Sequence, residues 1–317
     1  MKRDHDYDLI VIGAGIAGMV SAVTAASLGK RVAVVEKSRV GGSCTNTTCI
    51  PSKALIRLGH ASREMAHLER LGLLRLTGIG LEGARIMPRI RDIVRTAYEK
   101  DLPETFERIG VRMVQAQATF LDPHRIRAGG ETLSAKKFII AAGTIPLIPD
   151  IPGLAGIEFL TNETLYRLET LPRSLVILGG GVDGLEYASA FGRLGVETTV
   201  VEMAERLLPM ADGELVGRLL ELLRADGIRL LAGTKAVGLA DRQGRAVLTV
   251  ERRGGAQEEI EAERVLVAVG RKPDLAGLAL EKAGVEFNAR GIVTDRRLRT
   301  SIPHIWACGD IAGPYLL

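Results

Sequence analysis

A glycine pattern that occurs twice constrains the fold of this 317-residue chain more than any other feature. Three closely spaced glycines are followed by a fourth glycine and then by a glutamate, and each member recurs 166 residues later (179 minus 13). The first copy is Gly13, Gly15, Gly18, Gly29 and Glu36, and the second is Gly179, Gly181, Gly184, Gly195 and Glu202. Two such patterns, each ending in an acidic residue, predict two dinucleotide-binding domains.

Short apolar segments give both patterns the expected strand–turn–helix context. Residues 8–12 and 174–178 precede the glycines, and residues 31–35 and 196–201 are expected to form the next strands. Glycines permit the tight turn and let backbone N–H groups approach a pyrophosphate, while the acidic residue accepts hydrogen bonds from a ribose. A carboxylate at Glu202 would repel a ribose 2′-phosphate. The second site should therefore prefer NAD(H) to NADP(H), although Arg206 lies near it.

Composition limits the class of protein. The chain is long enough for two domains, and 46% hydrophobic with 25% charged residues is typical of a globular protein. The net charge of +4 comes from scattered basic residues, which disfavours a nucleic-acid partner. Residues 9–29 are uncharged and long enough to span a membrane, but their glycines indicate a strand, a turn and a helix. Asp4, Asp6 and Asp8 disagree with a signal peptide, so we expect a cytoplasmic protein without a membrane partner.

Two of the three cysteines, Cys44 and Cys49, lie within residues 41–53. Such a close pair in a cytosolic protein indicates catalysis or metal binding. No histidine or further cysteine lies nearby to complete a metal site, so we predict none. On a regular helix, residues five apart have Cα atoms roughly 8–9 Å apart, whereas a disulfide needs less than about 7 Å. A bridge would require a distorted helical turn, and a strained disulfide is the labile kind used in redox chemistry.

At this point a family resemblance becomes specific. Residues 41–53 resemble the redox signature of the family of dihydrolipoamide dehydrogenase, glutathione reductase and mercuric reductase, the class I pyridine nucleotide-disulfide oxidoreductases. The segment departs from that signature at Thr48, where the family usually has glycine. Residues 139–144 and 267–273 resemble the strands that leave the flavin and nicotinamide domains. Residues 306–310 resemble the motif whose aspartate holds the ribityl chain of the flavin. The resemblance covers the whole chain.

The resemblance implies roles for individual residues. Cys49 would face the flavin, Cys44 would exchange with the substrate, and Lys53 would lie near the flavin N5, paired with Glu186. The implied FAD contacts are Gly13, Gly15, Gly18, Glu36, Lys37, Gly42, Ser43, Lys53, Ala116, Ala142, Gly143, Gly309 and Asp310. The implied nicotinamide-nucleotide contacts are Gly179, Gly181, Val182, Gly184, Glu186, Glu202 and Gly270. Val182 stands where glutathione reductases tend to carry a gating tyrosine, which favours a lipoamide dehydrogenase-like protein.

The expected fold class is α/β, with two Rossmann-like FAD/NAD(P)-binding domains of the three-layer ββα type, the second inserted in the first. We expect the first part of the FAD domain at 1–147, the NAD domain at 148–271 and a return segment at 272–317. The family's C-terminal dimerisation domain, which supplies a catalytic His–Glu pair, is expected to be absent. That absence predicts a truncated chain or a naturally short gene with poor activity. The expected assembly is a homodimer for a full-length protein and a monomer for this chain.

The expected function is electron transfer between NAD(H), FAD and a Cys44–Cys49 disulfide, most like dihydrolipoamide dehydrogenase. The substrate would be a small-molecule or protein-bound disulfide or dithiol. Two alternatives stay open: a mercuric reductase-like enzyme, and a non-catalytic component that binds nucleotides or transfers electrons. We expect Cys308 to be a packing residue. The same holds for the five histidines, for which we expect surface or packing roles: His5, His60, His67, His124 and His304.

Overall fold

The computed structural model describes residues 5–75, 82–99 and 103–313. The chain divides into two compact units, each built from separate stretches of sequence. The first unit comprises residues 1–46, 94–145 and 271–317, and the second comprises residues 47–93 and 146–270.

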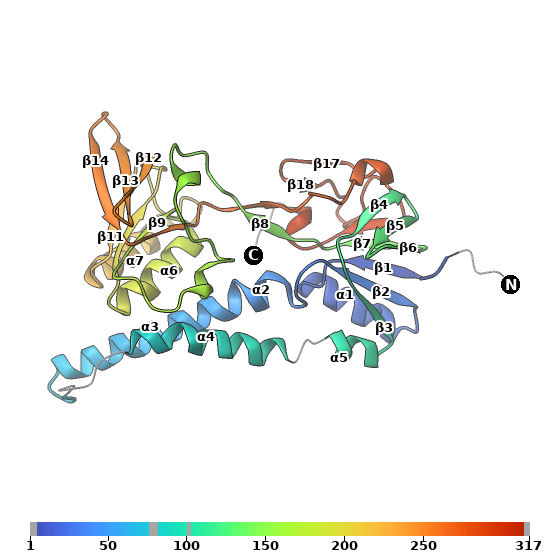
Figure 1. The fold of residues 1–317 in the computed structure, drawn as a ribbon, viewed down its shortest axis with the longest axis horizontal. Coiled ribbons are helices and arrows are strands. Elements are labelled where there is room, and N and C mark those ends of the chain that lie inside the picture. The colour runs from blue at the N-terminus through green and yellow to red at the C-terminus, as the bar shows by residue number, and fades with distance from the viewer. Residues whose placement is uncertain (1–4, 76–81, 100–102, 314–317) are drawn as a thin grey trace. The chain divides into compact units, whose positions relative to one another are not determined.

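The first unit contains a five-stranded sheet in the order β19-β7-β1-β2-β3, in which all neighbouring strands are parallel. Its strands are β1 (Leu9–Ile12), β2 (Val32–Glu36), β3 (Val111–Gln115), β7 (Phe138–Ile140) and β19 (Ile305–Ala307). An antiparallel meander lies on one side and α1 on the other (Figure 1). The meander is β4 (Thr119–Asp122), β5 (Arg125–Ala128) and β6 (Glu131–Ser134), and the helices are α1 (Ile16–Ser27), α2 (Gly42–Asn46) and α5 (Pro103–Arg108).

The side-chain alternation of β1 explains these three layers. Ile10 and Ile12 belong to a core cluster with residues of the meander, including Phe120 and Ile126. Leu9 and Val11 belong to a different cluster, with residues of α1. Because successive side chains of a strand point to opposite faces, an uninterrupted apolar strand must be covered on both sides.

The second unit repeats this plan. Its parallel sheet has the order β11-β10-β9-β15, and its antiparallel meander has the order β12-β13-β14. The sheet strands are β9 (Ser174–Leu178), β10 (Glu197–Val201), β11 (Arg229–Leu231) and β15 (Arg264–Val267). The meander strands are β12 (Thr234–Arg242), β13 (Arg245–Arg252) and β14 (Gln257–Ala262), and the helices are α3 (Cys49–Arg70), α4 (Gly83–Tyr98), α6 (Val182–Arg193) and α7 (Gly213–Ala225). The predicted α/β class with two three-layer domains is therefore confirmed.

Short elements complete the chain. Two of them, β8 (Thr144–Pro146) and β16 (Arg271–Pro273), pair with each other where the chain leaves and re-enters the first unit. The remaining elements are η1 (Leu154–Gly156), η2 (Leu165–Arg167), η3 (Leu280–Ala283), β17 (Phe287–Asn288), β18 (Gly291–Ile292) and η4 (Asp310–Ala312).

The division by compactness differs from the predicted domain limits at residues 47–93, which belong to the second unit. The physical reason is the packing of α3 and α4. A Cβ on Gly59 of α3 would lie 3.0 Å from the carbonyl oxygen of Ala190 on α6, so the two helices approach closely. Arg91 of α4 donates to the carbonyl oxygens of Tyr166 (3.1 Å) and Leu168 (2.8 Å). Contacts of this kind join distant parts of the chain and leave no local pattern in the sequence.

The α3–α6 contact makes a test of Gly59 direct. Gly59→Leu should lower the free energy of unfolding by about 1–3 kcal/mol, because the added side chain overpacks a close helix contact. Gly217 offers a matched control, since it lies within α7 and has open space around it. Gly217→Leu should be neutral or raise the same free energy by up to about 1 kcal/mol through helix propensity. Urea unfolding that ranks the two variants equally would contradict the close contact.

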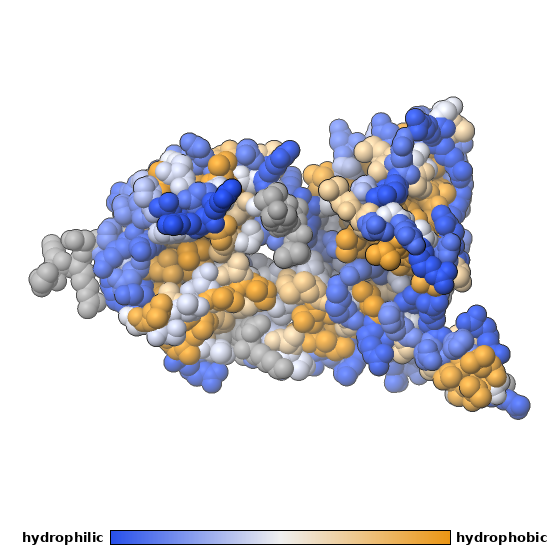
Figure 2. Space-filling model, turned by 180° about the vertical axis from the view of Figure 1, so that it is seen from behind, coloured by the Kyte–Doolittle hydropathy of each residue, from blue (hydrophilic) through white to orange (hydrophobic). Residues whose placement is uncertain are grey.

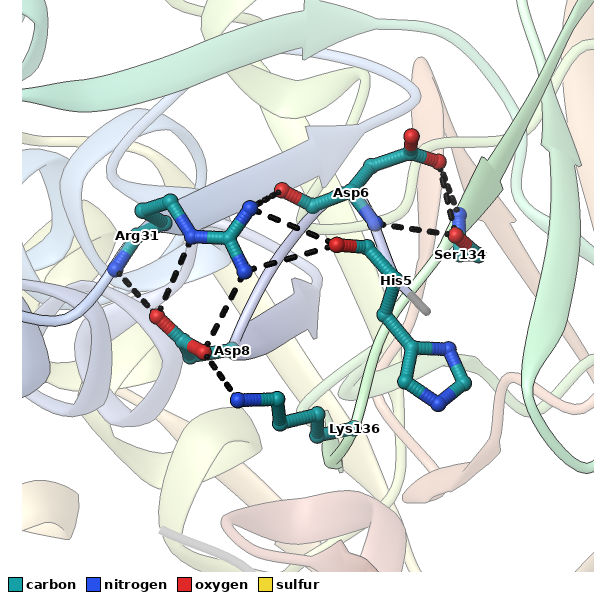
Figure 3. A network of polar contacts seen from close by, with 6 residues as sticks. All are labelled: His5, Asp6, Asp8, Arg31, Ser134 and Lys136. Carbon is teal, nitrogen blue, oxygen red and sulfur yellow. Dashed lines mark hydrogen bonds and ion pairs between the residues drawn. The ribbon is translucent and has the colours of Figure 1, made fainter. Parts of the chain in front are cut away.

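A polar network holds the N-terminal segment against the first unit (Figure 3). Asp8 accepts from the backbone N–H of Arg31 (3.1 Å) and from its guanidinium, and it forms an ion pair with Lys136 (3.0 Å). Asp6 accepts from the backbone N–H of Ser134 at 2.9 Å. The backbone N–H of Arg31, followed by the Lys136 and Arg31 side chains, holds the pKa of Asp8 well below its ordinary value.

This network predicts acid-sensitive stability. A carboxylate with a lowered folded-state pKa contributes stability that is fully present above its unfolded pKa of about 3.9 and is lost as pH falls towards the folded value. Asp8→Asn should therefore cost about 1–2 kcal/mol of unfolding free energy at pH 7, and the deficit should shrink below about pH 4. Asp150→Asn, at an exposed aspartate outside the network, is the control. Urea titrations giving Asp8→Asn the same deficit at pH 7 and pH 2.5 would contradict this assignment.

Three of the histidines lie together in the first unit. The His5 and His124 rings stack with centroids 5.0 Å apart, and those of His124 and His304 stack at 4.0 Å. His124 Nδ1 lies 3.1 Å from the carbonyl oxygen of Ala135. These contacts give the three side chains a packing role, and the described residues contain no group of three or more His, Cys, Asp or Glu that could hold a metal.

Apolar surface occurs at the far end of α3. Leu71, Leu73 and Leu74 are all exposed there, and Figure 2 shows apolar surface at this end, at the lower right. Within the part of the chain that the structure describes, no helix has the length and hydropathy needed to cross a lipid bilayer. The uncharged residues 9–29 instead form β1, a turn and α1, as expected.

Candidate nucleotide-binding sites and redox centre

The turn between β1 and α1 depends on the absence of side chains. Gly13 has φ +101°, and a Cβ there would lie 2.3 Å from the carbonyl oxygen of Ala141. A Cβ on Gly18 would lie 1.9 Å from the carbonyl oxygen of Gly13. The turn is thus pressed between the end of the next strand and the first turn of α1. The N-terminal N–H groups of a helix have no partner within the helix, so this end can bind an anion.

The second glycine turn repeats this geometry. Gly179 has φ +111°, and a Cβ there would lie 2.3 Å from the carbonyl oxygen of Ala268. A Cβ on Gly184 would lie 2.0 Å from the carbonyl oxygen of Gly179. Helices α1 and α6 begin at Ile16 and Val182, which are again 166 residues apart (182 minus 16). The sequence repeat is therefore a structural repeat.

The two acidic residues make equivalent contacts. Glu36 accepts from the backbone N–H groups of Ala14 (2.7 Å) and Ser38 (2.7 Å). Glu202 accepts from those of Gly180 (2.6 Å) and Ala204 (2.7 Å). Each carboxylate thus ties the glycine turn to the residues after the next strand. It lies at the carboxyl ends of the strands, where dinucleotides bind in doubly wound sheets.

A hollow next to Glu36 belongs entirely to the first unit. The predicted FAD contacts Gly13, Lys37, Ala116 and Ala142 line it together with Glu36. Asp274 lines it too and forms an ion pair with Lys37, although its own side chain is buried. Sequence reasoning missed Asp274, together with the lining residues Gln117, Ala276 and Leu278. The only local signal for Asp274 was its position directly after residues 267–273, which resemble the strand that leaves the nicotinamide domain.

The remaining predicted FAD contacts of the first unit lie on α2 and at two strand ends. A Cβ on Gly42, where α2 begins, would lie 2.8 Å from the Cα of Gly15, so α2 touches the glycine turn. Ser43 and Cys44 follow on α2, and Cys44 is half-buried. Thr144, next to Gly143, donates to Asp310 at 3.2 Å. Gly309, next to Asp310, has φ +74°.

The helical segment is interrupted between the two cysteines. Helix α2 ends at Asn46, and α3 begins at Cys49 after Thr48, whose φ is −125° and ψ is −89°. The regular helix expected to be incompatible with a bridge is therefore absent at this point. Cys44 lies in the first unit and Cys49 in the second, and their redox pairing stays a prediction.

Lys53 follows Cys49 by about one turn of α3 and reaches α6 within the second unit. Its ammonium group donates to both carboxylate oxygens of Glu186, at 2.8 and 2.7 Å. Beside this pair, burial raises the pKa of Tyr166, and the nearby Tyr187, Glu186 and Asp183 raise it further. The phenol of Tyr166 therefore stays neutral at working pH.

The other predicted nucleotide contacts of the second unit surround its glycine turn. Gly181 is the N-cap of α6, and Val182, its first residue, is 65% exposed. Gly270 has φ +122° where the chain returns to the first unit. In the loop after Glu202, Arg206 donates to the carbonyl oxygens of Pro209 and Ala211, both at 2.7 Å. Its guanidinium is therefore committed to its own loop.

The third cysteine, Cys308, has the character expected of a packing residue. Burial raises the pKa of its thiol, which disfavours the thiolate that redox chemistry needs. Its backbone N–H donates to the carbonyl oxygen of Ile140 (3.0 Å), so it lies where β19 joins the sheet.

Comparison with known proteins agrees with this geometry. The family described as pyridine nucleotide-disulphide oxidoreductase matches residues 7–316. A dihydrolipoyl dehydrogenase of Thermus scotoductus is 39% identical over 98% of this chain and 67% of its own length. A mercuric reductase of Staphylococcus aureus is 33% identical over 99% of this chain and 57% of its own length. The chain thus spans between just over half and two thirds of these relatives.

A solved structure gives the same picture. The HOCl-induced flavoprotein disulfide reductase RclA from Escherichia coli superimposes with a TM-score of 0.86 at 29% identity, covering 98% of this chain and 67% of that one. The family predicted from residues 41–53 is thereby confirmed, and so are FAD and NAD(P)H as the cofactors of that family.

Proposed function

Because this chain belongs to the pyridine nucleotide-disulphide oxidoreductase family, we propose that it passes electrons between NAD(H) and a Cys44–Cys49 disulfide through FAD. The observation that carries the proposal is the Lys53–Glu186 pair, which places a fixed cation on the same helix as Cys49. A non-catalytic nucleotide-binding protein would need neither this pair nor the two cysteines. The non-catalytic alternative is therefore the weaker one.

FAD is assigned to the first unit and NAD(H) to the second. The first turn lacks room for any side chain at Gly13 and Gly18, it faces a polar hollow, and Gly42 on α2 approaches it closely. In this assignment the N–H groups at the start of α1 bind the pyrophosphate, Glu36 and Lys37 contact the adenosine ribose, and Asp310 contacts the ribityl chain. FAD, when bound, would accept a hydride from NADH and supply an electron pair to the disulfide.

The residues of α2 and α3 hold charge and protons in the proposed reaction. Reduction converts NADH, one proton and the disulfide into NAD⁺ and two thiols. Cys49 begins the 22-residue helix α3, and a helix N-terminus stabilises negative charge there. Lys53, oriented by Glu186, adds a positive charge beside the flavin. Cys44 is then the thiol that exchanges with the acceptor.

The substrate proposal is a small-molecule or protein-bound disulfide, most like that of dihydrolipoyl dehydrogenase. Its support is the 39% identity to the Thermus scotoductus protein, against 33% for the mercuric reductase. A mercuric reductase-like activity is the alternative, and NADH oxidation dependent on Hg²⁺ but not on lipoamide would favour it. We further propose a cytoplasmic protein with no membrane partner, which forms a homodimer when full-length.

The assignment of the cysteines is tested by flavin spectroscopy. A thiolate beside an oxidised flavin gives a long-wavelength charge-transfer band. In the FAD-loaded protein, Cys44→Ser should show this band without a reductant, because Cys49 is then a free thiol that can ionise. Cys49→Ser should show none before or after dithionite, and Cys308→Ser serves as the control because it should behave like the unmodified protein. A Cys44→Ser protein without the band at neutral pH would reverse or remove the assigned roles.

The nicotinamide preference is tested by calorimetric titration. Glu202 would repel a 2′-phosphate, and Arg206 is held by the carbonyl oxygens of Pro209 and Ala211. NADH should therefore bind at least about tenfold more tightly than NADPH, or about 1.4 kcal/mol. Glu202→Ala should narrow the gap, and Glu205→Ala, at the exposed partner of Arg253, should leave it unchanged. Equal affinities in the unmodified protein, lost to NADPH alone in Arg206→Ala, would mean that Arg206 leaves its loop to bind the phosphate.

A further inference from the structure

Three residues from distant parts of the sequence form a hydrogen-bonded series in the first unit. Arg271, the first residue of β16, donates from Nε to Oγ1 of Thr144 and from Nη2 to the carbonyl oxygen of Thr144, both at 2.7 Å. Thr144, the first residue of β8, donates from Oγ1 to Oδ2 of Asp310 at 3.2 Å. Thr144 is buried, so these bonds are shielded from competing water.

The chemistry of the groups fixes the direction of this series. A guanidinium can only donate hydrogen bonds, whereas a hydroxyl has one hydrogen to donate and two lone pairs to accept. Because Thr144 Oγ1 accepts from Arg271 Nε, its hydrogen is left for Asp310, and an ionised carboxylate can only accept. The second bond, to the carbonyl oxygen of Thr144, holds the guanidinium plane. A lysine could not make both bonds in this geometry.

One further atom of Arg271 points to a ligand. Its Nη1 is buried and has no hydrogen-bond partner among the described residues. Buried polar groups without partners are uncommon, and each needs an explanation. The guanidinium thus orders Thr144 with two nitrogens and keeps the third for an acceptor that the protein itself does not supply.

We propose that Arg271 is a positioning residue for the flavin cofactor, acting through Thr144 to hold the carboxylate of Asp310 in the orientation that binds the ribityl hydroxyls. The inference rests on the proposed function, in which Asp310 contacts FAD. It assigns a second role to the strand by which the chain re-enters the first unit. Arg271 itself need not touch the isoalloxazine.

The test is the affinity of the FAD-free protein for FAD, followed by quenching of flavin fluorescence. Thr144→Val keeps the shape of the side chain and removes the hydroxyl, and Arg271→Met removes the donor. Each should weaken FAD binding about tenfold, and the double variant should be no weaker than the weaker single variant, since both break one series. Thr144→Ser should restore binding and Arg271→Lys should not. Lys272→Met removes a positive charge from the exposed neighbour on the same strand and should bind FAD like the unmodified protein.

The outcomes separate this inference from the proposed function. If the unmodified protein does not bind FAD, the proposed function fails first. If it binds FAD and Asp310→Asn weakens binding, but Arg271→Met and Thr144→Val do not, the inference is wrong and the proposed function stands. A double variant whose loss is the product of the single losses also overturns it, because the residues then act independently. Should Arg271→Met fail to fold, Thr144→Val and Thr144→Ser decide the question alone.

Discussion

The close approach of the glycine turns to the neighbouring strands is the constraint on which the rest of the structure depends. At Gly13 and Gly179, a β-carbon would lie 2.3 Å from a carbonyl oxygen of the next strand, so no other residue could occupy either position. This approach brings the start of each following helix over the carboxyl edge of its sheet. The helix N–H groups, the acidic residue of the next strand and the loops behind it then face one place. A binding site at this edge follows from the backbone before any ligand is considered.

The sequence predicted this frame because its determinants are local and duplicated. The strands at 9–12 and 174–178 were found within one residue of their limits, since uninterrupted apolar runs before a glycine turn have few other interpretations. The helix interruption near Thr48 followed from the spacing of two cysteines. The packing of residues 47–93 with the second unit, the ion pair of Asp274 with Lys37 and the stacked histidines were not foreseen. Each of these depends on contacts between residues far apart in the chain, which no periodicity records.

The acidic residues have a structural role that the motif alone does not indicate. Glu36 and Glu202 each accept two backbone N–H groups, one from the glycine turn and one from the loop after the strand. A carboxylate has about four acceptor positions, so these bonds leave capacity for ribose hydroxyls. The same side chain can thus hold the turn in place and present acceptors to the ligand. Replacement of either glutamate would therefore affect the shape of its turn as well as the contact with the nucleotide.

The differences between the two copies explain how one turn could serve two nucleotides. Where the first copy has Ala14, the second has Gly180, and a Cβ there would lie 2.0 Å from the side chain of Leu207. In the second copy the loop after the acidic residue therefore folds back onto the turn, and its Leu208 takes a positive φ of 48°. In the first copy the chain enters α2 instead, and Gly42 approaches the turn with backbone alone. The first arrangement brings a cysteine-bearing helix to the turn, whereas the second closes the loop that surrounds Arg206. Division of labour between a flavin and a nicotinamide thus follows from what comes after each glutamate, because the turn itself is the same.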